Sequence, residues 1–133
     1  MVLKFIASRL KYKTCRLKIR GRTFRALIAD SSLKQIVGLM YRKSMRPDQC
    51  MLFDFAYEAS HGIWMMNMLF PIDVIWLDSG MRVLHVEKNL APCKSAFGCR
   101  TYDAKGRSRY VIEFRSGTAS RLGINVGDAV LGC

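Results

Sequence analysis

The sequence contains no apolar stretch that could cross a membrane. Its only candidate, residues 59–77, is interrupted by Asn67, Pro71 and Asp73. An aspartate near the centre of a bilayer costs about 3 kcal/mol, which excludes a transmembrane helix here. Residues 1–13 also lack the uninterrupted run of about seven apolar residues that a secretory signal needs. We therefore expect a cytoplasmic protein.

The sequence also lacks the short motifs by which common active sites are recognised. It contains no GxSxG nucleophile motif, no HExxH zinc motif, no Walker-type phosphate loop and no CxxC pair. Low-complexity segments are absent too, and 50% of the residues are hydrophobic, as in a globular protein. These absences favour a non-enzymatic binding protein that carries neither a cofactor nor a metal ion.

Cysteine is sparse as well. The five cysteines are too few and too irregularly spaced to form the framework of a small secreted protein. Free thiols are the simplest prediction for them. Cys93 and Cys99 lie six positions apart in a segment that contains glycine, so these two could instead close a small disulfide loop. The sequence leaves both alternatives open.

Positive charge, in contrast, is abundant and unevenly distributed. The chain has 22 Lys and Arg against 10 Asp and Glu, a formal net charge of +12. Residues 1–29 contain nine basic side chains and no acid, whereas residues 47–80 contain five acids and no Lys or Arg. Such a field attracts nucleic acids and other polyanions without a specific pocket. The alternative is that these charges only solvate exposed strand faces.

The N-terminal third predicts a β-hairpin followed by a helix. Apolar and basic residues alternate over 15–20, and after Gly21 a second run covers residues 23–29, which indicates two strands with one apolar and one basic face. Ser32 and Gln35 have the spacing of a capping box, and apolar residues then recur at helical spacing as far as Met40.

The rest of the chain predicts more strands. Alternation, apolar runs and turn residues indicate strands at 51–55, 63–70, 72–77, 81–87, 109–115 and 128–131, a long surface connection at 89–108, and a short helical turn at 118–122. We therefore predict a mainly β fold that is either a β-sandwich or barrel-like. One substantial helix should pack against it, and a short helical turn should complete it.

Five segments together resemble a known family. They are GLMYR at 38–42, MLF at 51–53, WMMNMLFPIDVIW at 64–76, VIEFRSG at 111–117 and GD at 127–128. Their order and spacing resemble the family called domain of unknown function 192. The resemblance implies a β-sandwich-like fold and no established activity. A length of 133 residues predicts one domain over residues 1–133, in which 26–133 form the family-like core and 1–25 a basic N-terminal strand region.

The first functional hypothesis is a binding protein that engages nucleic acid or another polyanion through phosphate contacts. Tyrosines lie among the basic residues, and aromatic rings placed in this way can stack on unpaired bases. The sequence has no RNP-type core, GXXG loop or zinc finger, so binding should depend little on base sequence. The predicted contacts are Arg16, Lys18, Arg20 and Arg22 from the hairpin, and Lys94, Arg100, Lys105, Arg107 and Arg109 from the long connection and the strand after it.

The second hypothesis is a small-ligand-binding β-sandwich with a pocket near Trp64, Asn67 and Asp73. These side chains are polar or amphipathic within the most apolar part of the chain, where polar groups must find partners or face a ligand. The structural alternative is that Asn67 and Asp73 only bind backbone N–H groups.

A third hypothesis is a hydrolase-type enzyme. It would use Asp73, or alternatively Asp54, with His61 or His85 as acid, base or metal ligand, since such chemistry needs titratable groups within hydrogen-bonding reach. His85 alternates with Val83 along its predicted strand and is better explained as a packed or half-exposed residue of that strand face.

Overall fold

Eleven helices and strands form the described part of the chain. The computed structural model describes all residues except 1, 94 and 96. The elements, in chain order, are α1 (Val2–Arg9), β1 (Lys13–Ile19), β2 (Arg22–Ala29), α2 (Ser32–Val37), β3 (Gln49–Ala59), β4 (Ile63–Trp64), β5 (Ile72–Leu77), β6 (Val83–Leu90), β7 (Thr101–Tyr102), β8 (Ser108–Arg115) and α3 (Thr118–Leu122).

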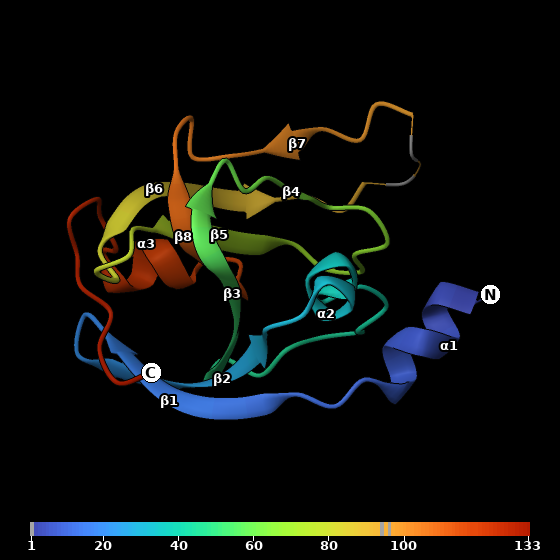
Figure 1. The fold of residues 1–133 in the computed structure, drawn as a ribbon, viewed down its shortest axis with the longest axis horizontal. Coiled ribbons are helices and arrows are strands. Elements are labelled where there is room, and N and C mark those ends of the chain that lie inside the picture. Colours follow the sequence, from blue (N-terminus) through green and yellow to red (C-terminus); the bar gives the residue numbers. More distant parts are fainter. Residues whose placement is uncertain (1, 94, 96) are drawn as a thin grey trace.

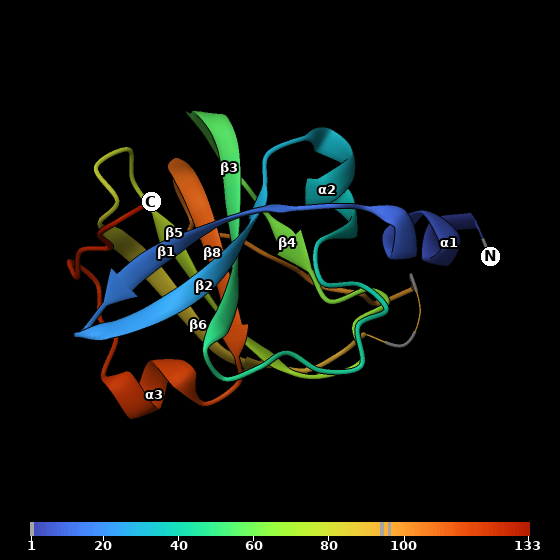
Figure 2. The ribbon, with the colours of Figure 1, turned by 90° about the horizontal axis from the view of Figure 1, so that it is seen from below.

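One large sheet dominates the fold (Figures 1 and 2). Its strand order is β1-β2-β3-β8-β5-β6, and every neighbouring pair is antiparallel except β2 and β3. The C-terminal segment lies between the two edge strands, because Leu131 bridges to Lys18 of β1 and Ala129 bridges to Arg82 just before β6. The mainly β, barrel-like prediction is therefore confirmed, although residues 128–131 form isolated bridges and not the predicted strand.

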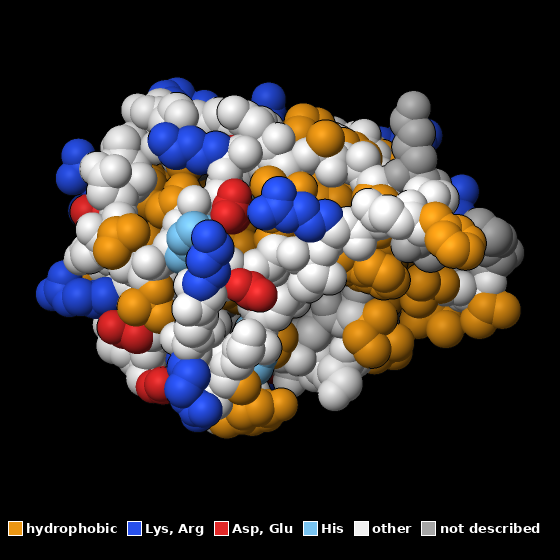
Figure 3. Space-filling model, turned by 90° about the horizontal axis from the view of Figure 1, so that it is seen from above, with side chains coloured by type: hydrophobic (Ala, Val, Ile, Leu, Met, Phe, Trp, Pro, Cys, Tyr) orange, Lys and Arg blue, Asp and Glu red, His pale blue; other side chains and the backbone are white. Residues whose placement is uncertain are grey.

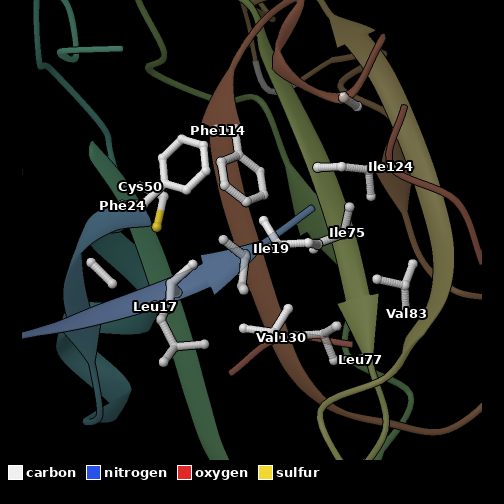
Figure 4. Packing of buried hydrophobic residues seen from close by; sticks show 14 residues of the cluster. Leu17, Ile19, Phe24, Cys50, Ile75, Leu77, Val83, Phe114, Ile124 and Val130 are labelled. Carbon is white, nitrogen blue, oxygen red and sulfur yellow. The ribbon is translucent and has the colours of Figure 1, made fainter. Parts of the chain in front are cut away.

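The inner side of the curved sheet encloses one apolar core. Leu17, Ile19 and Phe24 of the basic hairpin point inward and face side chains of β5, β6 and β8 (Figure 4). The rings of Phe24 and Phe114 meet edge to face with centroids 5.0 Å apart. The predicted alternation of the hairpin is thus confirmed, since its apolar side chains fill the core and its basic side chains face outward.

A second apolar core covers the opposite side of β3, β8 and β5. It contains Met51, Phe53 and Val74 of the sheet and is covered by the chain around Leu39 and Met65. Strands β3, β5 and β8 are consequently buried on both faces along their central part, and all six residues of β5 are buried. Burial on both faces explains why residues 72–77 form an uninterrupted apolar run.

The predicted substantial helix is shorter than expected. Helix α2 has six residues, and Ser31, not Ser32, caps it by accepting a hydrogen bond from Lys34 N at 3.3 Å. It ends at Gly38, whose φ of +49° is unfavourable for other residues. The longest helix, α1 with eight residues, is one that the sequence did not predict. No helix in the described chain is long and apolar enough to span a membrane.

The predicted central strand at 63–70 is wrong. Only Ile63–Trp64 is extended, and this short strand pairs with β7 in a separate two-stranded sheet. Asn67 has a φ of +60°, which breaks the extended backbone of a strand. The segment instead packs over the second core, where Met65 and Met68 are buried.

Four of the five cysteines form disulfides, whereas the simplest prediction was free thiols. Cys15 and Cys133 form a disulfide with a Cα separation of 5.7 Å, because the bridge between Lys18 and Leu131 brings the chain end beside β1. Cys93 and Cys99 form the second pair, at 5.5 Å. The prediction of free thiols is therefore wrong for Cys15 and Cys133, whereas for Cys93 and Cys99 the disulfide alternative describes the structure. Cys50 is the remaining buried thiol.

Candidate functional site

A cleft of about 490 Å³ opens on the side of the sheet that carries the second core. Figure 2 shows α2 beside β3 and β4, and these elements supply its walls. One wall is α2 with the turn that follows it, the second is formed by β3, and the third is residues 61–64. The volume lies within the range of about 300–1,000 Å³ that is common for small-molecule sites.

Glu113 is the one acidic residue among the described residues that line the cleft. It lies on β8 directly opposite Met51 of β3 and Val74 of β5, both in the second core. The residue is only 5% exposed, and burial raises the pKa of its carboxyl group to about 8. Among the described residues, none donates a hydrogen bond to this carboxyl group or forms an ion pair with it. Glu113 is thus an almost fully buried acid with no hydrogen-bonding partner among the described residues, and its carboxyl oxygens keep some contact with the open cleft.

Aromatic side chains form much of the cleft wall. The His61 imidazole stacks on the Phe55 ring with centroids 3.9 Å apart and planes 9° from parallel. His61 Nε2 lies 3.0 Å from the Tyr57 carbonyl oxygen. Because a carbonyl oxygen only accepts hydrogen bonds, Nε2 carries the proton, and Nδ1 of the neutral ring is left as an acceptor.

Three further hydrogen bonds hold the walls in place. The buried Trp76 Nε1–H donates to the His61 carbonyl oxygen at 2.7 Å. Gln35 Nε2 of α2 donates to the Ala29 and Asp54 carbonyl oxygens at 3.1 and 2.8 Å. The first bond positions the chain segment that carries the imidazole, and the Gln35 bonds connect α2 to the end of β2 and to the middle of β3. The cleft is therefore built from elements that are connected to each other.

The entrance is wide and apolar. Trp64 and Tyr57 are 44% and 66% exposed, so their rings lie at the rim. No Lys or Arg is among the described residues that line the cleft, although the chain has 22 of them. An apolar, aromatic wall with one unpaired carboxyl group at its base can bind a small ligand that has an apolar body and one polar group.

The structure does not bring Trp64, Asn67 and Asp73 together in one pocket. Trp64 lines the cleft, whereas the other two are not part of its lining. Asn67 Nδ2 lies 3.7 Å from Met40 Sδ. Asp73 is fully buried, and its carboxylate accepts hydrogen bonds from Asn89 N at 2.9 Å and Ala119 N at 2.8 Å. Asp73 therefore binds backbone N–H groups, as the structural alternative to a ligand site predicted.

The groups considered for a hydrolase lie apart. The described partners of the Asp73 carboxylate are backbone amides, so no titratable side chain pairs with it. Asp54 pairs with Arg109, and His85 Nε2 lies 2.8 Å from a carboxylate oxygen of Glu87. In the described part of the chain, no three His, Cys, Asp or Glu side chains are grouped as metal ligands would be.

The basic side chains on the outer face of the hairpin lie close together and form a positively charged patch. Arg16 of β1 lies directly opposite Arg25 of β2, and Lys18 lies two positions along the same face. Like charges that face each other across two strands repel, so this arrangement concentrates positive potential. Arg20 is partly neutralised, since it lies 3.9 Å from Asp128, while Arg22 is exposed next to the turn.

The basic residues of the long connection lie elsewhere. In Figure 1 the hairpin is at the bottom and β7 at the top, and Figure 3 shows Lys and Arg as separate groups on the β7 side. Arg109 pairs with Asp54, and Arg107 donates to the Glu58 carbonyl oxygen at 2.7 Å. Arg100 and Lys105 are exposed, and Lys94 is outside the described residues. The nine predicted contacts therefore do not form one surface.

Glu113 was missed in the sequence, although one feature pointed to it. The strand prediction at 109–115 was correct, and its apolar neighbours Ile112 and Phe114 point into the inner core. Glu113 belongs to the other strand face, which is solvated in a sheet covered on one side only. Val111 on that same face is apolar, and this was the available sign that the second face is covered too.

Comparison with known proteins supports the resemblance noted in the sequence. Residues 15–132 match the family called domain of unknown function 192, which is described as an uncharacterized ACR. The chain belongs to this family. Relatives include two archaeal UPF0127 proteins, one of Thermococcus kodakarensis, 34% identical over 103 residues, and one of Pyrococcus horikoshii, 35% identical over 108 residues. Both alignments cover 77% of this chain, with 61% of the first relative's length and 83% of the second's.

Two solved structures share the fold of this domain of unknown function 192 protein. A Sinorhizobium meliloti protein, described as a "putative transcription regulator", superposes with a TM-score of 0.85 at 31% identity, covering 93% of this chain and 97% of the other. A Novosphingobium aromaticivorans protein of unknown function gives 0.81 at 26% identity, covering 94% and 95%. These likenesses extend over the barrel and its cleft side but assign no activity.

Proposed function

We propose that the chain, acting as a single domain over residues 1–133, is a non-enzymatic binding protein whose cleft takes a small ligand. The observation that carries this proposal is the unpartnered Glu113 carboxyl group at the base of an apolar cleft. Burying a polar group without a partner costs about 1–3 kcal/mol. The Glu113 carboxyl group, which keeps some contact with the open cleft, bears part of that cost, and a ligand that supplies a partner recovers it.

The walls support a ligand of modest size. Phe55, His61 and Trp64 offer apolar and aromatic surface, and the hydrogen bonds of Gln35 and Trp76 hold the surrounding elements in place before a ligand arrives. A preformed site loses less conformational entropy on binding than one that must fold around its ligand.

A fragment screen by protein NMR tests this proposal. Ligands should shift the resonances of Trp64 and of the other cleft residues. The Glu113→Gln variant should lose or weaken these effects, while the matched control Glu87→Gln should not, because Glu87 pairs with His85 outside the cleft. Shifts that avoid the cleft, or that are identical in both variants, would contradict the proposal.

A second candidate function is polyanion binding by the hairpin. It is favoured by the facing pair Arg16 and Arg25 with Lys18 beside them, an arrangement that is costly without an anion. The description of the Sinorhizobium meliloti relative as a regulator agrees with a nucleic acid as the polyanion. Contacts of this kind would be to phosphates and would carry little base specificity.

A salt series of fluorescence anisotropy tests the second candidate. Labelled DNA and RNA are titrated with heparin as competitor, using a variant with Ser at positions 16, 18, 20 and 22. That variant should bind more weakly and lose part of the salt dependence. The matched control, Ser at positions 100 and 105, should change little. The control removes two positive charges and the hairpin variant four, so a loss about half as large in the control would show that only total charge matters.

The cytoplasmic location expected from the sequence is also a proposal. Disulfides persist mainly in oxidising compartments, so the redox state of Cys15 and Cys133 in cells tests it. Reduced thiols in freshly trapped extracts would support the cytoplasm. A fully oxidised pair would argue against it.

A further inference from the structure

We infer that the cleft selects a primary ammonium group attached to an apolar or aromatic body, with the Glu113 carboxylate as its partner. This inference rests on the proposed function, because it specifies the ligand class of the same cleft. The structural relationship that carries it is a single acid at the base, aromatic rings on the walls and no cation among the described lining residues.

The first argument is the absence of a competing partner for Glu113. Its cross-strand neighbours Met51 and Val74 are apolar. Gln35, the amide side chain on the facing helix, already donates to two backbone carbonyls. An ammonium group that reaches the base of the cleft would therefore be the first strong donor available to this carboxylate.

The second argument is the character of the remaining polar groups. Apart from Glu113, the titratable side chains of the described lining are His61 and Tyr57. His61 Nδ1 is an acceptor when Nε2 donates to the Tyr57 carbonyl, so it suits an N–H donor and not an anion. An anionic ligand would find no Lys or Arg among these residues, so nothing in the described lining would compensate its charge.

The third argument is the aromatic wall. Phe55, Tyr57 and Trp64 line the cleft, and the negative faces of such rings attract cations within about 6 Å by about 0.5–2 kcal/mol. Their area also accommodates the apolar body of the ligand. The cleft thus combines the two features that distinguish a substituted ammonium ion from an alcohol or an acid of the same shape.

Binding must be coupled to proton release. Burial raises the pKa of Glu113 to about 8, so the carboxyl group of the free protein is mostly protonated at neutral pH. A bound ammonium ion stabilises the carboxylate, and the carboxyl proton leaves to solvent. The ligand keeps its own charge, and close to one proton is released for each ammonium ion that binds at pH 7 or below.

The net charge of +12 opposes a cation only at long range. At physiological ionic strength the screening length is about 8 Å, so distant Lys and Arg contribute little inside the cleft. The acidic stretch 47–80, which includes all of β3 and β4, supplies two of the three walls and contains no Lys or Arg.

Isothermal titration calorimetry with three probes of matched shape tests the inference on the intact chain. The probes are 2-phenylethylamine, 2-phenylethanol and 3-phenylpropionate, each titrated in two buffers of different ionisation enthalpy. The amine should bind at least about tenfold more tightly than the other two and release nearly one proton. Its affinity should rise about tenfold per pH unit from pH 6 to 7, since the ionised fraction of Glu113 does so.

Two variants make the test specific. Glu113→Gln should abolish the preference for the amine, its proton release and its pH dependence, with Glu87→Gln unchanged. Tyr57→Ala, at the exposed rim, removes one ring without a risk to the core and should weaken amine binding severalfold.

The outcomes separate the two proposals. Equal or tighter binding of the alcohol or the acid, with NMR shifts in the cleft, overturns the ammonium inference and leaves the binding function in place. Amine binding without proton release overturns it as well. If the fragment screen and all three probes leave the cleft resonances unchanged, both proposals fail.

Discussion

The Asp73 carboxylate connects β5 to α3 by accepting a hydrogen bond from Ala119 N at 2.8 Å. The aspartate is fully buried, with 0% of its surface exposed. Its other oxygen accepts from Asn89 N at 2.9 Å, at the end of β6. One buried carboxylate therefore joins three elements. This explains how a charged residue can lie within an apolar run without forming a ligand site.

Replacing Asp73 with Ala should destabilise the fold without removing the cleft. The substitution leaves the N–H groups of Ala119 and Asn89 without their acceptor, and we expect a loss of about 2–4 kcal/mol in the free energy of unfolding. Urea denaturation measures it. Asp103→Ala is the control, because Asp103 accepts an exposed bond from Lys105 N, and it should change little. A small loss for Asp73→Ala would contradict the structural role.

The stability of the protein should fall as the pH rises toward 8. Glu113 has an ordinary pKa near 4.5 when unfolded and about 8 when folded, so the folded state binds more protons between these values. The stabilisation is complete below pH 4.5 and is lost at about 1.4 kcal/mol per pH unit up to about pH 8. Glu113→Gln should remove this slope, and Glu87→Gln should keep it. Equal slopes in all three proteins would refute the assignment.

Local patterns were sufficient to predict much of the fold. The hairpin follows from alternation over residues 15–29, and β5 follows from an apolar run with turn residues after it. The segment 63–70 has the same composition, but Asn67 adopts a left-handed conformation and the chain covers the sheet instead of joining it. An apolar run without periodicity does not distinguish these two outcomes.

The candidate site was only partly predictable for a different reason. Trp64 was identified because an amphipathic ring stands out in an apolar segment. Glu113 was not, because a charge on a strand normally faces solvent, and its burial depends on α2 and β4, which are distant in the sequence. Tertiary packing decides which face of a central strand is covered. The sequence pattern of that strand alone does not carry this information.

The two disulfides should differ in their contribution to stability. Cys15 and Cys133 are 118 positions apart, whereas Cys93 and Cys99 are separated by 6. The chain-entropy model gives about 5 kcal/mol for the longer loop and about 2 kcal/mol for the shorter one. Replacing each pair with serines and measuring guanidinium denaturation under oxidising conditions should show the larger loss for the long loop. Equal losses would contradict this ranking.

Substituting Gly38 with Ala should damage the cleft more than a matched substitution at Gly21. Both glycines have positive φ angles, +49° and +76°, so alanine is strained at either position, and the ψ of −126° at Gly38 lies outside the left-handed helical region and makes the strain there larger. A Cβ atom at Gly38 would also lie 3.2 Å from Phe53 Cζ, whereas nothing lies within 4 Å of one at Gly21. Because Phe53 lines the cleft, Gly38→Ala should weaken binding of fragments found for the wild type, and Gly21→Ala should lower stability alone. Thermal denaturation and NMR titration of both variants measure the two effects, and an unchanged affinity in Gly38→Ala would mean that the ligand does not depend on this wall.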